Sequence, residues 1–139
     1  MTMKSPFGLE GKRILVLGGG LGIGEATVRL IATHGAQVAV VDRELERAEH
    51  VAAEVAANGG TAAAYCIDVV DDAAMVAGIA QIEREFGSLD GMATVIGMAA
   101  WGSLLELDMA TWDLDQSRNL RYFFLAAREV ARSMIARKA

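Results

Sequence analysis

Apolar and polar residues are arranged along the chain in blocks that predict strands and helices in turn. Four apolar runs are too short for helices and have the length of strands buried on both faces of a parallel sheet. These runs are residues 14–17, 37–41, 61–67 and 91–96. The segments between and after them carry apolar residues at three- and four-residue spacing, which is typical of amphipathic helices. The pattern therefore predicts strands that alternate with helices.

The predicted helices have recognisable ends. Gly35 ends the first helix, the second covers residues 44–57, and the third starts at a cap on Asp71 or Asp72 and ends at Gly87. The last helix covers residues 116–137, and its basic end suits the helix dipole. The expected apolar faces are Ala26, Leu30 and Ile31 in the first helix; Leu45, Ala48, Ala52 and Val55 in the second; Met75, Ile79, Ile82 and Phe86 in the third; and Leu120, Phe123, Phe124, Ala127, Val130, Met134 and Ile135 in the last.

This alternation predicts an α/β fold, a Rossmann-type doubly wound parallel sheet. With right-handed crossovers and a reversal after three strands, the strand order is 3-2-1-4. Ligands of such sheets bind beyond the carboxyl ends of the strands, at the switch point between strands 1 and 4. Gly18, Asp42, Asp68 and Gly97 mark the four strand ends, so we expect them around one crevice.

The turn after the first strand is rich in glycine. A strand, a glycine turn and a helix together present backbone N–H groups to a phosphate. The spacing is G-x-x-x-G-x-G, because Ile23 occupies the place of the last glycine of G-x-G-x-x-G, and no Gly-Lys-Ser/Thr follows as a P-loop requires. A turn that serves only packing, or a methyltransferase-type G-x-G-x-G, are the alternatives. The predicted phosphate-binding residues are Gly18, Gly20, Leu21, Gly22, Ile23 and Gly24.

Asp42 lies about 20 residues beyond this turn, where a carboxylate accepts hydrogen bonds from the adenosine ribose. It would repel a 2′-phosphate, and Gly19, Gly20 and Leu21 offer no basic side chain to such a group. NAD is therefore the expected cofactor rather than NADP. The adjacent Arg43, included in the predicted site, slightly opposes this preference. The alternative role of Asp42 is to cap the following helix.

Composition narrows the function further. The 139 residues, 53% of them apolar and only one a proline, predict one folded domain spanning residues 1–139. A net charge of −5 without a basic cluster outside the last helix argues against nucleic-acid binding, and no apolar run has the length of a membrane span. The lone Cys66 and two histidines indicate a cytoplasmic protein without disulfides or a metal site.

The glycine turn with Ile23 between its last two glycines resembles the cofactor turn of the short-chain dehydrogenase/reductase family. Residues 87–93, Gly-Ser-Leu-Asp-Gly-Met-Ala, resemble that family's run into its fourth strand. Residues 118–124 are similar to its helix that carries the asparagine of the catalytic tetrad. The resemblance implies that Asp68 and Val69 meet the adenine and that Asn119 organises a water in the proton relay. The alternatives are a helix cap for Asp68 and a solvent-exposed side chain for Asn119.

The chain departs from the family at the fourth strand end. Thr94-Val95-Ile96-Gly97 replaces the usual Asn-Asn-Ala-Gly, so Gly97 alone remains of the segment near the nicotinamide. Leu17 stands where the family has a threonine that hydrogen-bonds this segment. We expect both changes to belong together, with Leu17 packing on Val95 or Ile96 in place of a polar contact.

The family moves hydride between a nicotinamide and an alcohol or carbonyl substrate, with a Tyr-x-x-x-Lys pair and a serine. Here Val69 and Ala126 stand four residues after the two tyrosines, so that pair is absent. The resemblance covers the family's N-terminal half, truncated before the fifth strand, and the chain alone is expected to be inactive. It also implies a homo-oligomer through the final helix, and the open fourth-strand edge argues against a well-behaved monomer. A non-catalytic nucleotide-binding or interaction module, or an S-adenosylmethionine-dependent methyltransferase, are the alternative functions.

Overall fold

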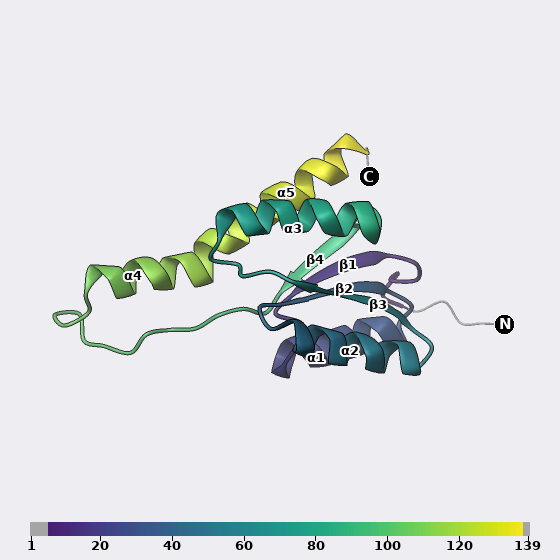
Figure 1. The fold of residues 1–139 in the computed structure, drawn as a ribbon, viewed down its shortest axis with the longest axis horizontal. Coiled ribbons are helices and arrows are strands. Elements are labelled where there is room, and N and C mark those ends of the chain that lie inside the picture. The colour runs from purple at the N-terminus through teal and green to yellow at the C-terminus, as the bar shows by residue number, and fades with distance from the viewer. Residues whose placement is uncertain (1–5, 138–139) are drawn as a thin grey trace.

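A four-stranded parallel sheet forms the centre of the computed structural model, which describes residues 6–137 (Figure 1). The strands are β1 (Arg13–Leu17), β2 (Gln37–Asp42), β3 (Thr61–Cys66) and β4 (Gly91–Thr94). Their order is β3-β2-β1-β4, which confirms the predicted topology. The first five residues of the polar lead-in and Lys138 at the basic end lie outside the described residues.

Helices cover both faces of the sheet. In Figure 1, α1 (Gly22–Thr33) and α2 (Leu45–Ala57) lie on one face, while α3 (Asp72–Glu85) and α5 (Tyr122–Ala136) lie on the other. The last helix starts earlier than predicted. It begins as α4 (Met109–Gln116) and passes through a five-residue π-helical turn, η1 (Ser117–Arg121), into α5. The segment after β4 and α4 project away from the sheet (Figure 1).

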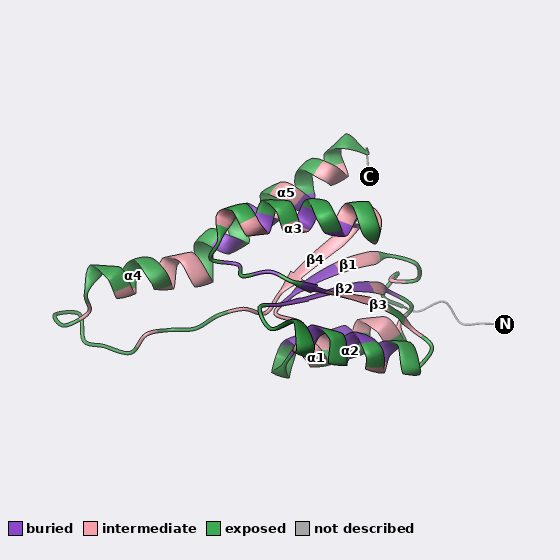
Figure 2. Cartoon of the chain, viewed as in Figure 1, coloured by how far each residue is buried: buried purple, intermediate pink, exposed green. Residues whose placement is uncertain are grey.

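Two apolar clusters flank the sheet, because successive residues of a strand point to opposite faces. Val16 is buried on the side of α1 and α2, and Leu15 and Leu17 are buried on the side of α3 and α5. Figure 2 shows the buried residues concentrated on the strands and on the helix faces turned toward them. The core therefore holds the carboxyl ends of the strands in fixed positions.

Two expected helix faces were partly wrong. In α1 the residues Ala26 and Leu30 are exposed, whereas Gly24 and Val28 are buried. The reason is that Gly24 lies against the turn after β1, and this close approach selects Val28, four residues on, for the core. In α2 the predicted Ala48, Ala52 and Val55 are buried, but Val51 is buried as well and Leu45 is exposed.

The face of α5 also differs from the prediction. Its buried residues are Tyr122, Leu125, Ala126 and Val130, and only Val130 was expected. Leu120, Phe123, Phe124 and Ile135 are exposed. The helix is apolar on most sides, so periodicity alone does not select a face. The orientation is fixed by Tyr122, which is buried and donates its hydroxyl hydrogen to the Ile96 carbonyl at 2.8 Å.

Candidate nucleotide-binding site

The glycine turn joins β1 to α1 at the carboxyl end of the sheet. The amides of Gly18 and Gly19 donate to the Val41 carbonyl at 2.8 and 2.9 Å, which fixes the turn beside β2. Leu21 occupies the N-cap position of α1 and makes no side-chain cap hydrogen bond. Since the first amides of a helix lack intrahelical partners, this helix start offers N–H donors and the positive end of its dipole to an anion.

Two glycines of the turn are required by close backbone approach. A Cβ atom on Gly24 would lie 1.8 Å from the Gly18 carbonyl oxygen, a distance that no side chain tolerates. A Cβ on Gly20 would lie 2.7 Å from both Asp42 Oδ2 and Arg47 Cβ. The turn therefore lies directly against the end of β2, with the Asp42 carboxylate beside it.

Asp42 ends β2 and is the one buried charged residue among the described residues, with 8% of its surface exposed. Its Oδ1 accepts a hydrogen bond from the Glu44 amide at 3.0 Å. The N-cap of α2 is Glu44, so Asp42 orders the turn that precedes the helix and is not its cap. Its Oδ2 lies beside the glycine turn, 2.7 Å from the place that a Cβ of Gly20 would occupy.

Asp68 and Val69 follow β3 on the same edge of the sheet. Asp68 is exposed, and its Oδ1 accepts from the Val70 amide at 3.2 Å. It does not cap α3, because that position belongs to Asp71, which accepts from the Ala74 amide at 2.9 Å. Val69 is buried in the cluster under α3 and α5.

These strand ends surround a cavity of about 440 Å³. The predicted residues that line it are Gly18, Leu21, Asp42, Arg43, Asp68, Val69 and Gly97. Gly20, Gly22, Ile23, Gly24 and Asn119 are not among its lining residues. Residues that the sequence analysis missed include Arg47, Met98, Leu114 and Arg118. Arg47 lies on α2, and no signal in the sequence indicates that it approaches the glycine turn.

Asn119 connects the final helix to the segment after β4. Its Oδ1 accepts from the Met98 amide at 3.0 Å, while its Nδ2 donates to the Met98 carbonyl at 2.7 Å and to the Asp115 carbonyl at 2.8 Å. The residue is exposed, as the alternative expectation had it, and its side-chain amide still makes these three hydrogen bonds to backbone groups. It lies in the π-helical turn, a feature that is frequent at functional sites.

Asp115 and Arg118 reinforce this connection one turn away. Asp115 Oδ2 accepts from the Ala100 amide at 2.8 Å, and its Oδ1 accepts from Arg118 Nε at 2.9 Å. The Ala100 amide, and then the Arg118 guanidinium, lower the pKa of the Asp115 carboxyl below its usual value. Asn119 and Asp115 therefore hold the segment after β4 at three backbone groups, which are the Met98 amide, the Met98 carbonyl and the Ala100 amide.

Leu17, Val95 and Ile96 lie where the chain departs from the family pattern. The Leu17 carbonyl accepts from the Val95 amide at 3.0 Å, which continues the pairing of β1 with β4 beyond Thr94. Ile96 packs against the cluster that contains the fully buried Leu17, whereas Val95 packs against the opposite cluster. Of the two expected partners, Ile96 is thus the one on the same side as Leu17.

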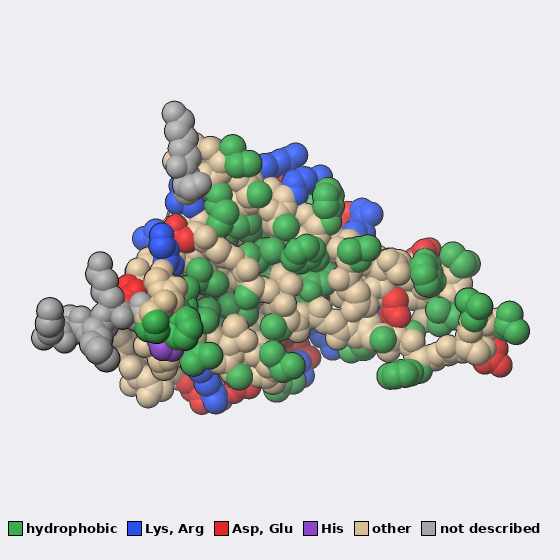
Figure 3. Space-filling model, turned by 180° about the vertical axis from the view of Figure 1, so that it is seen from behind, with side chains coloured by type: hydrophobic (Ala, Val, Ile, Leu, Met, Phe, Trp, Pro, Cys, Tyr) green, Lys and Arg blue, Asp and Glu red, His purple; other side chains and the backbone are tan. Residues whose placement is uncertain are grey.

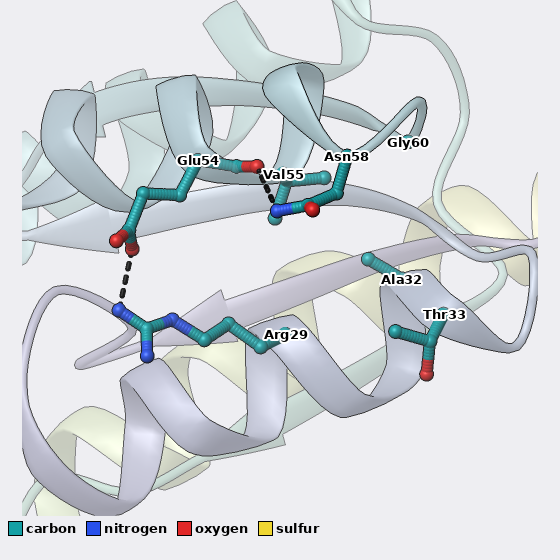
Figure 4. Close-up of a pocket in the computed structure, with 7 residues that line it drawn as sticks. All are labelled: Arg29, Ala32, Thr33, Glu54, Val55, Asn58 and Gly60. Atoms are coloured by element: carbon teal, nitrogen blue, oxygen red, sulfur yellow. Dashed lines mark hydrogen bonds and ion pairs between the residues drawn. The ribbon is translucent and has the colours of Figure 1, made fainter.

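A second cavity, of about 450 Å³, lies between α1 and α2 (Figure 4). Arg29 reaches across it to Glu54 at 2.5 Å, and Asn58 Nδ2 donates to the Glu54 carbonyl at 2.8 Å. Its polar groups are thus engaged with one another. Among the described residues, no three His, Cys, Asp or Glu side chains are grouped as metal ligands would be, and no helix has the length and apolarity needed to cross a membrane.

Comparison with known proteins decides the family. The profile described as "short chain dehydrogenase" matches residues 12–139. The chain belongs to this family. It is 37% identical over 132 residues to 2,3-dihydro-2,3-dihydroxybenzoate dehydrogenase of Bacillus subtilis, covering 95% of this chain and 51% of that protein. It is 35% identical to D-threitol dehydrogenase of Mycolicibacterium smegmatis, covering 97% of this chain and 52% of the other.

Solved structures of family members have the same fold. A short-chain dehydrogenase/reductase from Serratia marcescens aligns with a TM-score of 0.86 and 36% identity, over 90% of this chain and 51% of that one. A metagenomic short-chain oxidoreductase in complex with NADP aligns with a TM-score of 0.87 and 30% identity, over 94% and 59%. This short-chain dehydrogenase chain thus spans about half the length of the curated relatives it matches. The comparisons do not support the methyltransferase or the non-catalytic module.

Proposed function

We propose that this chain forms the cofactor-binding half of an NAD-dependent oxidoreductase that acts on a small alcohol or carbonyl substrate. The observation that carries the proposal is the convergence at Gly20, where the glycine turn, the Asp42 carboxylate and the stem of Arg47 meet without room for a Cβ. A backbone surface next to a buried carboxylate suits a diphosphate joined to a ribose. The nicotinamide, when bound, supplies the acceptor or donor of hydride.

The residues around the crevice divide the binding task. The uncapped amides at the start of α1, from Gly22 to Gly24, do not line the cavity but follow Leu21, which does, and in this proposal they hold the diphosphate. Asp42 accepts hydrogen bonds from the ribose hydroxyls, and Asp68 with Val69 borders the adenine. Gly97 lies toward the nicotinamide, and Asn119 positions the segment at Met98 that follows it. Asn119 is the catalytic-tetrad residue in this proposal, acting on a water of the proton relay.

NAD is the proposed cofactor because a buried carboxylate at the ribose disfavours a 2′-phosphate. A structural neighbour of the same fold is in complex with NADP, so the preference for NAD in this proposal rests on Asp42 and not on the fold. The sequence has no Tyr-x-x-x-Lys, so we propose that the 139 residues bind cofactor without turning over substrate. A cytoplasmic location and a homo-oligomer through the final helix complete the proposal.

The test is a calorimetric titration of the 139-residue chain with NAD, NADP and S-adenosylmethionine. We expect NAD to bind most tightly and S-adenosylmethionine not to bind. Asp42→Asn should weaken NAD binding about tenfold, because one charged hydrogen bond contributes about 1.5 kcal/mol or more. Asp71→Asn, which preserves the helix cap of α3, is the matched control and should bind as the parent does. Tightest binding of S-adenosylmethionine, or absence of NAD binding, would refute the proposal.

A further inference from the structure

Two arginines at the ribose end of the crevice share one glutamate. Arg43 and Arg47 both line the cavity next to Asp42. Glu44 Oε1 lies 3.1 Å from Arg47 Nη2 and 3.9 Å from Arg43 Nε. All three side chains are at least 40% exposed, so their arrangement depends on the charges rather than on packing. Together, Asp42, Glu44, Arg43 and Arg47 form a charged edge of the crevice, with two carboxylates and two guanidinium groups.

The position of Arg47 matters for what this edge can bind. Its Cβ and Asp42 Oδ2 both approach the point where a Cβ of Gly20 would stand, so the two side chains begin at the same spot beside the turn. A phosphate on the 2′-oxygen of a ribose held by Asp42 would lie within the reach of the long Arg47 side chain. Arginine side chains are the usual protein partners of such a phosphate. In the structure, however, Arg47 is directed to Glu44.

We infer that Glu44 is a second determinant of cofactor choice, which acts by holding Arg47 and Arg43 away from a 2′-phosphate. The inference rests on the proposed function, since it assumes that the ribose lies at Asp42. Glu44 is a positioning residue and does not line the cavity itself. With Glu44 present the edge is neutral and both arginines have a partner. Without it the edge gains one net positive charge and both guanidinium groups become available to an anion.

The expected effect is modest, because the three side chains are exposed and salt screens them. Loss of one carboxylate beside two arginines should strengthen binding of a 2′-phosphate by about fivefold, the size typical of a screened charge contact at a protein surface. The gain should shrink as ionic strength rises. Asp42 remains as a barrier, so the Glu44 variant relaxes selectivity for NAD and does not reverse it.

The experiment measures affinities of 2′,5′-ADP and 5′-AMP, which differ by the 2′-phosphate alone, together with NAD. Glu44→Gln should raise the affinity ratio of 2′,5′-ADP to 5′-AMP about fivefold at low salt, with NAD binding unchanged. Glu49→Gln removes the same charge from the exposed face of α2 and should leave the ratio unchanged. Arg47→Gln placed in the Glu44→Gln background should cancel most of the gain, because Arg47 is then the phosphate's partner.

The outcomes separate this inference from the proposed function. If the parent chain binds NAD and Glu44→Gln leaves the ratio as it was, the glutamate has no role in selectivity and the inference is refuted alone. An equal gain in the Glu49→Gln variant would also refute it, because net charge would then explain the effect. If neither the parent nor any variant binds NAD, the proposed function fails and the inference fails with it.

Discussion

Asn119 brackets the backbone of Met98 from both sides, with its carboxamide oxygen on the Met98 N–H at 3.0 Å and its nitrogen on the Met98 carbonyl at 2.7 Å. This pairing imitates a strand partner for the residue that follows Gly97. It joins the π-helical turn to the segment beyond β4, which otherwise runs away from the sheet (Figure 1). A residue selected for its similarity to a catalytic asparagine thus has a clear structural task here.

The first prediction concerns this contact. Asn119→Asp keeps the shape but replaces the donating nitrogen by an oxygen, which would face the carbonyls of Met98 and Asp115. We expect a loss of about 1–2 kcal/mol of unfolding free energy, since two donated hydrogen bonds disappear. Urea denaturation measures it. Asn58→Asp removes a single exposed bond to Glu54 and should cost less than half as much; an equal cost would contradict the bracketing role.

The second prediction concerns the close approach within the glycine turn. Gly24→Ala places a Cβ 1.8 Å from the Gly18 carbonyl oxygen, and because that oxygen is a backbone atom, the start of α1 must shift. We expect a loss of more than about 2 kcal/mol and loss of NAD binding. Gly59→Ala has open space around its Cβ and strains only a φ of +81°, at a cost of about 1 kcal/mol. It should retain NAD binding, as calorimetry would show.

The third prediction is a pH dependence at the connection between the helix and the segment after β4. Asp115 has a lowered pKa in the folded chain, so its stabilising contribution is complete above the ordinary carboxyl value near 3.8. It disappears as the pH falls through the lower folded value. We expect the Ala100 amide, which donates to Asp115, to lose protection from hydrogen exchange below about pH 4 and not between pH 5 and 7.

Asp115→Asn should remove this acid dependence at Ala100, since the amide side chain does not titrate. Asp113→Asn on the same helix is the control, because Asp113 is exposed and the Ala100 amide donates to Asp115 instead. Protection that declines in the same way in both variants would show that another group is responsible.

Periodicity and strand ends were sufficient for the architecture, because a parallel sheet with buried strands leaves few arrangements of the crossovers. The same rules placed Asp42 and Asp68 at one crevice. These rules failed where one tertiary contact decides which residue is buried. Val28 is buried instead of Leu30 because Gly24 meets Gly18, and periodicity does not contain that contact. Arg47 was missed because its role depends on the distance between α2 and the turn.

The final helix shows the same limit. Its sequence is apolar nearly all round, and the face that reaches the core is chosen by Tyr122 through its bond to the Ile96 carbonyl. The π-helical turn also makes the buried face hard to predict, because it changes the rotation of α4 relative to α5. No residue type in 117–121 indicates such a turn from the sequence. As a result, Leu120, Phe123, Phe124 and Ile135 remain exposed, and they offer an apolar surface to another chain.

The last prediction concerns that exposed face. Leu120 in η1, and Phe124 and Ile135 in α5, are each at least 61% exposed. In Figure 3, which views the molecule from the side where α5 lies in front of α3, hydrophobic side chains gather across this region. Contiguous apolar surface of this kind is typical of protein–protein interfaces. We therefore expect the chain to self-associate through α5.

Light scattering coupled to size exclusion, over a range of concentrations, measures this association. Replacing Leu120 and Phe124 by serine should weaken it by at least tenfold, since buried aromatic and aliphatic anchors dominate interface energies. Phe7→Ser is the matched control: Phe7 has the same 63% exposure as Phe124 but precedes β1 and lies outside α5. A parent chain that stays a monodisperse monomer at every concentration, or a Phe7 variant that dissociates equally, would contradict an interface on this helix.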